Sequence, residues 1–162
     1  MSAVVCYGGG DMEAKTIDHG PAVRQFSVML PNRVGALAAL VKMLRTHAIE
    51  VLGLSMQDAR DATIARIVVS DPETTGHLFL EKGIPHTSCE LLVVELKEAG
   101  SNLLQCLDHL MMAETNVDFA YPLLSVYRGY SLLAMHVDDL EFAASILNSA
   151  GFTLVWQDTL SR

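Results

Sequence analysis

Apolar positions along the chain follow two periods in succession, and this succession occurs twice. In the first occurrence a short segment is apolar at alternate positions, and a run spaced i, i+3, i+4, i+7 follows it. The alternating positions are Phe26, Val28 and Leu30, and the run comprises Leu37, Leu40, Val41 and Leu44. A period of two indicates a strand with one buried face, and a helical period indicates a helix with one buried face.

The second occurrence lies 66 residues further along, which is the separation between Phe26 and Leu92. Its alternating positions are Leu92, Val94 and Leu96, and its helical run comprises Leu103, Cys106, Leu107 and Leu110. One pattern repeated at a constant offset predicts two copies of one small unit. Units of this size are only marginally stable alone, so we expect the two copies to be fused side by side.

The first copy is predicted to run strand, helix, strand, strand, helix, strand, which is the ferredoxin-like order. Pro31 ends the first strand because it has no N–H to donate, and the composition of residues 58–61 is typical of a turn. Asp71 suits the N-cap before Pro72, and Gly83 suits the end of that helix. The predicted strands cover 23–30, 50–57, 64–70 and 84–90, and the predicted helices cover 36–47 and 72–82.

The second copy starts without a linker, so we expect the orientation of the two halves to be fixed. Its predicted strands cover 91–97, 116–123, 131–137 and 152–159. Its predicted helices are 101–114 and a second one that Asp138 caps and Gly151 ends. The predicted fold class is α+β, with two tandem ferredoxin-like βαββαβ units whose antiparallel sheets carry helices on one face. We expect a flexible leader over 1–20, a first unit over 21–90 and a second unit over 91–162.

The charge balance argues against several classes of partner. With 11 basic and 19 acidic residues, the chain has a formal net charge of −8. It lacks the clustered lysines and arginines that phosphate contacts require, so we expect no nucleic-acid partner. No apolar run is long enough to span a bilayer, and we expect no membrane association. The three cysteines, Cys6, Cys89 and Cys106, form no CxxC pair, which is typical of free thiols in a reducing cytosol. We therefore expect a cytoplasmic protein.

Motifs for metal binding or catalysis are not found in the sequence. The six histidines form no HxH, HxxxH or HExxH spacing, so we expect no metal site. Neither a Gly-x-Ser-x-Gly motif nor a local cysteine–histidine arrangement indicates nucleophilic catalysis. We expect no cofactor, and we expect that the protein is not an enzyme.

The loop after the first predicted strand carries a recognisable motif. Residues 32–37 read Asn-Arg-Val-Gly-Ala-Leu, which resembles the ACT domain family, where this loop typically reads Asn-x-Pro-Gly-x-Leu. Asn32, Gly35 and Leu37 match the family pattern, and Val34 replaces its proline. Residues 49–51, Ile-Glu-Val, are similar to the family's Ile-Asn-Val. The resemblance covers residues 23–160 as two ACT-like copies, an arrangement similar to small stand-alone tandem ACT proteins of bacteria.

The resemblance implies regulatory binding of a small molecule, most often an amino acid, between domains that pair side by side. Backbone N–H groups at the start of the first helix lack intrahelical partners and can hold a carboxylate with the help of the helix dipole. Gly35 allows a close approach to the backbone, and Arg33 can add charge-assisted hydrogen bonds. The neighbouring domain's second strand would supply the side-chain pocket, here residues 53–57. The implied ligand-binding residues are Asn32, Arg33, Val34, Gly35, Ala36, Leu37, Leu54, Ser55 and Gln57.

Simpler interpretations of this loop remain open. Asn32 can act only as a helix cap, and Gly35 can be needed only for the conformation of the turn. Arg33 can be a solvated side chain with no ligand contact. In the second copy the motif is changed, because Glu98 replaces Asn32 and Ser101 replaces Gly35 at the 66-residue offset. Since Glu98 would repel a carboxylate, we do not expect the second loop to bind an amino acid in the family's usual way.

The leading functional hypothesis is a non-catalytic regulatory protein that binds an amino acid and forms a homodimer through its ACT domains. One alternative is the regulatory subunit of an amino-acid biosynthetic enzyme. The small subunit of acetolactate synthase is similar in length and opens with an ACT unit, although its second half is not an evident second copy. The other alternative is an assembly module that binds no ligand.

Overall fold

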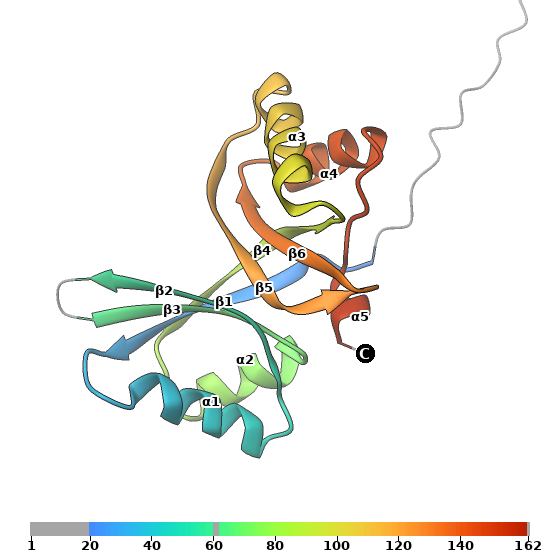
Figure 1. Cartoon of the computed structure of the whole chain (residues 1–162). Helices are drawn as coiled ribbons and strands as arrows, with labels where there is room; N and C mark the ends of the chain where they lie inside the picture. Colours follow the sequence, from blue (N-terminus) through green and yellow to red (C-terminus); the bar gives the residue numbers. More distant parts are fainter. Residues whose placement is uncertain (1–19, 60–61, 162) are drawn as a thin grey trace, which may run out of the picture.

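The computed structural model describes residues 20–59 and 62–161, and this part of the chain contains six strands and five helices (Figure 1). The strands are β1 (Val23–Pro31), β2 (Val51–Ala59), β3 (Ala62–Val69), β4 (His86–Leu96), β5 (Val117–Tyr127) and β6 (Tyr130–Val137). The helices are α1 (Ala36–Thr46), α2 (Pro72–Glu81), α3 (Ala99–Met112), α4 (Leu140–Ser149) and the short α5 (Gln157–Leu160). Residues 1–19 of the leader predicted over 1–20, and residues 60–61 of the predicted turn, lie outside the described residues.

A single long strand, β4, joins the two repeated units. Its first half pairs with β1, where Leu91 lies opposite Val23, and its second half pairs with β6, where Leu92 lies opposite Met135. The boundary predicted between residues 90 and 91 falls inside this strand. Because the strand is continuous, no hinge separates the units at this point.

The strands form one closed ring in the order β1-β3-β2-β5-β6-β4, and every strand pair among the described residues is antiparallel. The ring closes where Gly53 of β2 lies opposite Leu123 of β5. Within it the first unit keeps the ferredoxin-like order β4-β1-β3-β2. The second unit has β4-β6-β5, and Leu154 forms an isolated bridge to the outer side of β4.

Three apolar clusters fill the molecule. Helices α1 and α2 cover the outer face of the first sheet, α3 and α4 cover that of the second, and Figure 1 shows these two pairs on opposite sides of the strands. The third cluster fills the space between the two sheets and combines Val23, Val68 and Leu91 with Leu123 and Leu132. Each sheet is therefore covered on both faces near the junction, and each unit depends on the other for part of its core.

The second helix of each unit begins with an aspartate cap. The Asp71 carboxylate accepts a hydrogen bond of 2.9 Å from the Thr74 N–H, as predicted from the sequence. In the second unit the cap is Asp139, which accepts one of 2.9 Å from the Phe142 N–H, so the prediction of Asp138 was wrong. Asp138 instead accepts a bond from the N–H of Asp139, its immediate neighbour.

The last predicted strand, 152–159, is not a strand. Beyond the bridge at Leu154 the chain turns into α5, and Gln157 explains the change of direction. The side chain of Gln157 is buried, accepts a hydrogen bond from the N–H of Arg24 and donates one to the carbonyl of Val69. These contacts tie the end of the chain to the first unit.

The helical run predicted for α3 is only half buried. Cys106 and Leu110 are buried, but Leu103 and Leu107 are 37% and 38% exposed. Helix α3 packs against α4, and its buried side therefore lies on one edge of the apolar stripe. The other edge faces solvent together with Leu104 and Met111.

Candidate functional site

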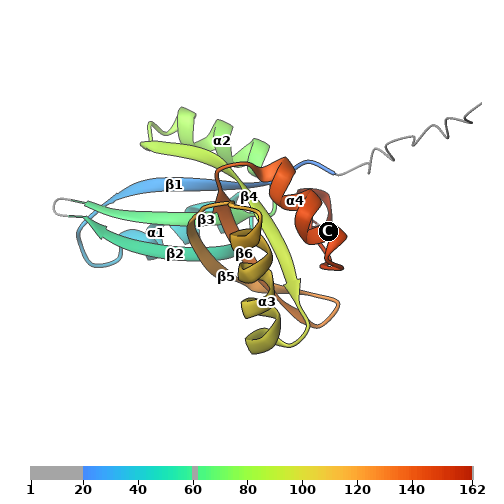
Figure 2. The ribbon, with the colours of Figure 1, turned by 90° about the horizontal axis from the view of Figure 1, so that it is seen from above.

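The loop between β1 and α1 lies at a free end of the molecule. Figure 2 shows this loop beside the end of β2 and the start of β3, away from α4 and the C-terminus. Pro31, the last residue of β1, pairs with Ala62 at the start of β3, so the loop begins where the ladder stops. No residue of the second unit lines the pocket described below.

Helix α1 begins without a side-chain cap. Its N-cap residue is Gly35, with a left-handed φ of 85°, and no side-chain hydrogen bond closes the first turn. A Cβ added at Gly35 would meet nothing within 4 Å, so the backbone conformation is what requires glycine here. The N–H of Ala36 is bonded to Arg33, but the first-turn N–H groups of Leu37 and Ala38 have no hydrogen-bond partner among the described residues. They are available to an acceptor from outside.

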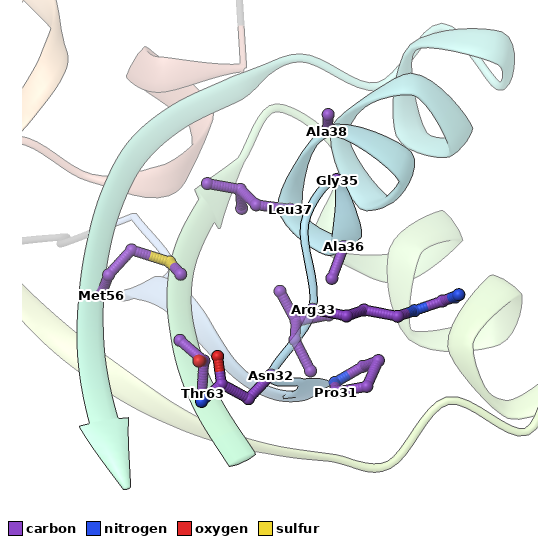
Figure 3. Close-up of a pocket in the computed structure, with 10 residues that line it drawn as sticks. Pro31, Asn32, Arg33, Gly35, Ala36, Leu37, Ala38, Met56 and Thr63 are labelled. Atoms are coloured by element: carbon purple, nitrogen blue, oxygen red, sulfur yellow. The ribbon is translucent and has the colours of Figure 1, made fainter.

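A pocket of about 340 Å³ opens beside this helix start (Figure 3). Five residues predicted as ligand contacts line it, namely Asn32, Arg33, Gly35, Ala36 and Leu37. Five further residues complete the lining, namely Leu30, Pro31, Ala38, Met56 and Thr63. Of these, Met56 lies within the range 53–57 that was expected, from a neighbouring domain, to supply the side-chain pocket. The volume is at the small end of the range for metabolite sites, which is about 300–1,000 Å³.

The other four predicted residues do not line the pocket. Val34 lies at the outer tip of the loop and is fully exposed. Leu54 packs into the apolar cluster under α1 and α2. Ser55 and Gln57 alternate with Leu54 and Met56 along β2, which places them on the opposite face of the sheet.

Met56 fell inside the expected range 53–57 but was not singled out as a ligand-binding residue, whereas Thr63 was not predicted at all. Met56 is two residues beyond Leu54 on the same face of β2, and period-two alternation was a sufficient signal for it. Thr63 reaches the pocket because it lies opposite Leu30 in the β1–β3 ladder. This strand register depends on tertiary structure, and no local sequence pattern around Thr63 indicates it.

The electrostatic character of the pocket comes from the backbone. Among the described residues, no Asp, Glu, Lys or His lines it, and the one charged lining residue is Arg33. Figure 3 shows the Arg33 side chain directed away from Met56 and Leu37. A carboxylate at this helix start would therefore meet orphan N–H groups and the positive end of the helix dipole, with no acidic side chain opposing it.

The corresponding loop of the second unit is built differently. The Asn102 side chain accepts a hydrogen bond of 2.8 Å from the N–H of Glu98, and the Ser101 hydroxyl donates one of 3.1 Å to the Glu98 carboxylate. A negative charge thus lies beside the start of α3. This geometry supports the expectation that the second loop does not take an amino-acid carboxylate.

The thiols and the buried phenol stay protonated near neutral pH. Burial raises the pKa of Cys106 to about 11. Burial also raises the pKa of Cys89, although the positive charge of Arg66 partly offsets the effect. Burial is likewise the main cause that raises the pKa of Tyr121. Both described cysteines are free, and neither has the lowered pKa of an activated nucleophile.

Within the described residues, no group of three or more His, Cys, Asp or Glu side chains is placed to hold a metal ion. The same part of the chain contains no helix that is both long and apolar enough to cross a membrane.

Comparison with solved structures identifies the fold. The protein BT0572 of Bacteroides thetaiotaomicron superposes with a TM-score of 0.79 at 16% identity, over 87% of this chain and 96% of that chain. The ligand-free regulatory subunit of aspartate kinase from Thermus thermophilus gives a TM-score of 0.57 at 10% identity, over 80% and 91% of the two chains. A structure of aspartokinase alpha and beta subunits gives a TM-score of 0.55 at 14% identity, over 80% of this chain and 91% of that chain. At these identities the likeness concerns the fold alone.

Sequence comparison gives a more specific result. No curated protein is similar enough to give a significant match. The family model described as an ACT domain pair, however, matches residues 21–162, which is nearly the whole chain and includes both repeats. The chain therefore belongs to the family of ACT domain pairs.

Proposed function

We propose that this protein is a non-catalytic regulatory protein that binds an amino acid at the start of α1. The observation that carries the proposal is the uncapped first turn of α1 beside the pocket of about 340 Å³. Helices α2 and α4 begin with bonded aspartate caps, and the start of α3 has Glu98 beside it. The N–H groups of Leu37 and Ala38 are positioned to bind a ligand carboxylate.

The ligand's ammonium group finds neutral oxygen acceptors at the other end of the loop. Asn32 and Thr63 both line the pocket, and Figure 3 shows their side chains next to each other. An amide oxygen and a hydroxyl can each accept a hydrogen bond from an ammonium group. The pocket thus offers complementary groups for both charged ends of an α-amino acid.

The pocket's position also supports the proposal of a homodimer. It opens at the end of the first unit that the second unit does not cover. A second copy placed side by side could close it, so ligand binding would favour the associated state. A ligand that binds one state better than another shifts the equilibrium between them, which is the physical basis of regulation. We place this regulatory protein in the cytoplasm.

A thermal-shift screen against the twenty amino acids tests the proposal. A ligand at about 100 times its Kd adds about 2.7 kcal/mol to the free energy of unfolding, which raises Tm by roughly 5–10 °C for a chain of this size. We expect a selective shift that Gly35→Val abolishes, because valine cannot take the left-handed φ without strain. Gly129→Val is the matched control, since Gly129 has a φ of 82° and open space around its Cβ position.

The absence of a shift with all twenty amino acids would contradict the proposal. So would a shift that Gly35→Val and Gly129→Val leave equally unchanged, because the ligand would then bind elsewhere. The fold of both variants is checked by far-ultraviolet circular dichroism before ligand is added.

One observation favours a second function, that of a regulatory subunit of an amino-acid biosynthetic enzyme. Leu104, Met111 and Met112 of α3 are 62%, 69% and 80% exposed, and Leu124 and Val126 of β5 are each 67% exposed. Apolar surface of this kind is typical of protein interfaces. Light scattering of the purified chain with Leu104→Glu and Met111→Glu separates the two functions. Loss of a homodimer assigns the surface to self-association, whereas an unchanged homodimer leaves it for an enzyme subunit.

A further inference from the structure

The part of the pocket remote from the helix start is apolar. Figure 3 shows the side chains of Leu37, from α1, and Met56, from β2, directed toward one another across the hollow. Met56 is 45% exposed although it lies on the face of β2 that Leu54 buries under the helices. These two side chains therefore present apolar surface that the protein itself does not cover.

Charged ligand side chains find no partner in this part of the pocket. Among the described residues, the lining contains no carboxylate to pair with a lysine- or arginine-like group. Its one cation, Arg33, is directed away from Met56 and Leu37. Enclosing an ionised group without a partner is unfavourable, whereas an apolar group gains from leaving water. The described lining thus offers a charged side chain of either sign no partner beside Met56 and Leu37.

The size of the pocket limits the ligand further. Within one copy of the chain, about 340 Å³ is available to the carboxylate, the ammonium group and the side chain together. Because this volume is at the lower end for metabolite pockets, it suits a compact aliphatic or thioether side chain. It suits a bulky ring system less well.

We propose that the ligand is an α-amino acid with a compact, uncharged, apolar side chain, of the size of valine, leucine, isoleucine or methionine. Met56 is the residue that determines this specificity. The inference rests on the proposed function, since it names the ligand class of the same site. It adds that discrimination takes place at β2, away from the loop that binds the charged groups common to all amino acids.

Isothermal titration calorimetry with a panel of free amino acids tests this inference. The panel contains valine, leucine, isoleucine and methionine on one side, and lysine, aspartate and threonine on the other. We expect at least one of the four apolar amino acids to bind wild-type protein at least about tenfold more tightly than lysine, aspartate or threonine does. Hydrophobic pockets typically discriminate single methylene groups by about 10- to 200-fold.

Two matched variants locate the discrimination. Met56→Thr is expected to weaken binding of the best apolar ligand about tenfold and to leave threonine affinity within about threefold, because it removes apolar contact while keeping the loop. Met29→Thr is the control, since Met29 is 54% exposed and does not line this pocket. It should leave all affinities unchanged. Circular dichroism of both variants confirms that they fold.

The outcomes separate this inference from the proposed function. If lysine, aspartate or threonine binds most tightly and Gly35→Val abolishes that binding, the site is correct and the ligand class is wrong. If Met56→Thr behaves like Met29→Thr, Met56 does not determine specificity. If no amino acid on the panel binds the folded wild-type protein, the inference and the proposed function both fail.

Discussion

Gly53 of β2 and Leu123 of β5 are Cα partners at the point where the ring of strands closes, and they leave no room for a side chain on Gly53. A Cβ at this position would lie 2.5 Å from Leu123 Cδ2 and 3.3 Å from Val68 Cβ. Both neighbours belong to the buried cluster between the sheets. A side chain here would therefore force the buried Leu123 side chain to shift, and this close approach, not a left-handed backbone angle, favours glycine at position 53.

Gly53→Ala should destabilise the protein. Overpacking a well-filled core typically costs about 1–3 kcal/mol, and we expect a loss in this range in urea unfolding. Gly100→Ala is the control, because Gly100 lies in α3 with nothing within 4 Å of its Cβ position. That change should stabilise the protein by about 0.5–1 kcal/mol. If the two variants changed the free energy of unfolding equally, the close approach of Leu123 to Gly53 would be contradicted.

Tyr121→Phe should weaken the contact between the units. The Tyr121 hydroxyl donates a hydrogen bond of 2.7 Å to the Gln25 side-chain oxygen, and both residues are buried. Removing the donor leaves a buried acceptor unpaired, which typically costs about 1–3 kcal/mol. The free energy of unfolding in urea measures the loss. A change below about 0.5 kcal/mol would indicate that water replaces the hydroxyl.

The same residue predicts a loss of stability in base. Burial raises the pKa of Tyr121 above its ordinary value of 10.0, so the unfolded chain loses this proton before the folded chain does. The stabilisation is therefore complete below pH 10 and declines as pH rises toward the folded pKa. Tyr121→Phe should lack this component of the pH dependence. Phenolate absorbance during a pH titration should likewise show one late-ionising tyrosine in the native wild type.

Asp71 predicts a loss of stability in acid. Hydrogen bonds from the Thr74 hydroxyl and N–H lower the pKa of Asp71 below its ordinary value of 3.8. The stabilisation is present above pH 3.8 and is lost as pH falls through the folded pKa. At neutral pH, Asp71→Ala should cost about 1 kcal/mol, the usual effect of losing a cap. A deficit of the same size at pH 2 would show that the carboxylate charge is not involved.

How far the sequence predicts this fold depends on whether a signal is local. Asp71 and Gly83 were assigned correctly because a cap and a left-handed glycine act within one turn of chain. Leu103 and Leu107 were expected to be buried, but the roll of α3 toward α4 decides which edge of its stripe packs. The end of the chain looked like a strand, yet the tertiary bonds of Gln157 turn it into α5.

For the candidate site, too, the residues with a local sequence signal were predicted and those that depend on strand pairing were not. The loop residues Asn32 and Gly35 were found from a short motif, and both line the pocket. Ser55 and Gln57 were assigned to it from a neighbouring domain's expected position, whereas Met56 lies between them and faces the pocket. Thr63 could be found only from the register of β1 with β3. The motif thus located the loop that borders the pocket, and strand pairing placed Thr63 opposite that loop's preceding strand.

The continuous β4 strand has a consequence for how the chain folds. Because β4 supplies an element to both units and the cluster between the sheets needs both, the first half of the chain has no complete partner for its inner face until the second half is made. The pairings that close the ring join segments far apart in sequence, as Gly53 with Leu123 does. Contacts of such separation slow folding and prolong the lifetime of open strand edges. We therefore expect the chain to fold as one slow cooperative unit, and neither half to be soluble when it is produced alone.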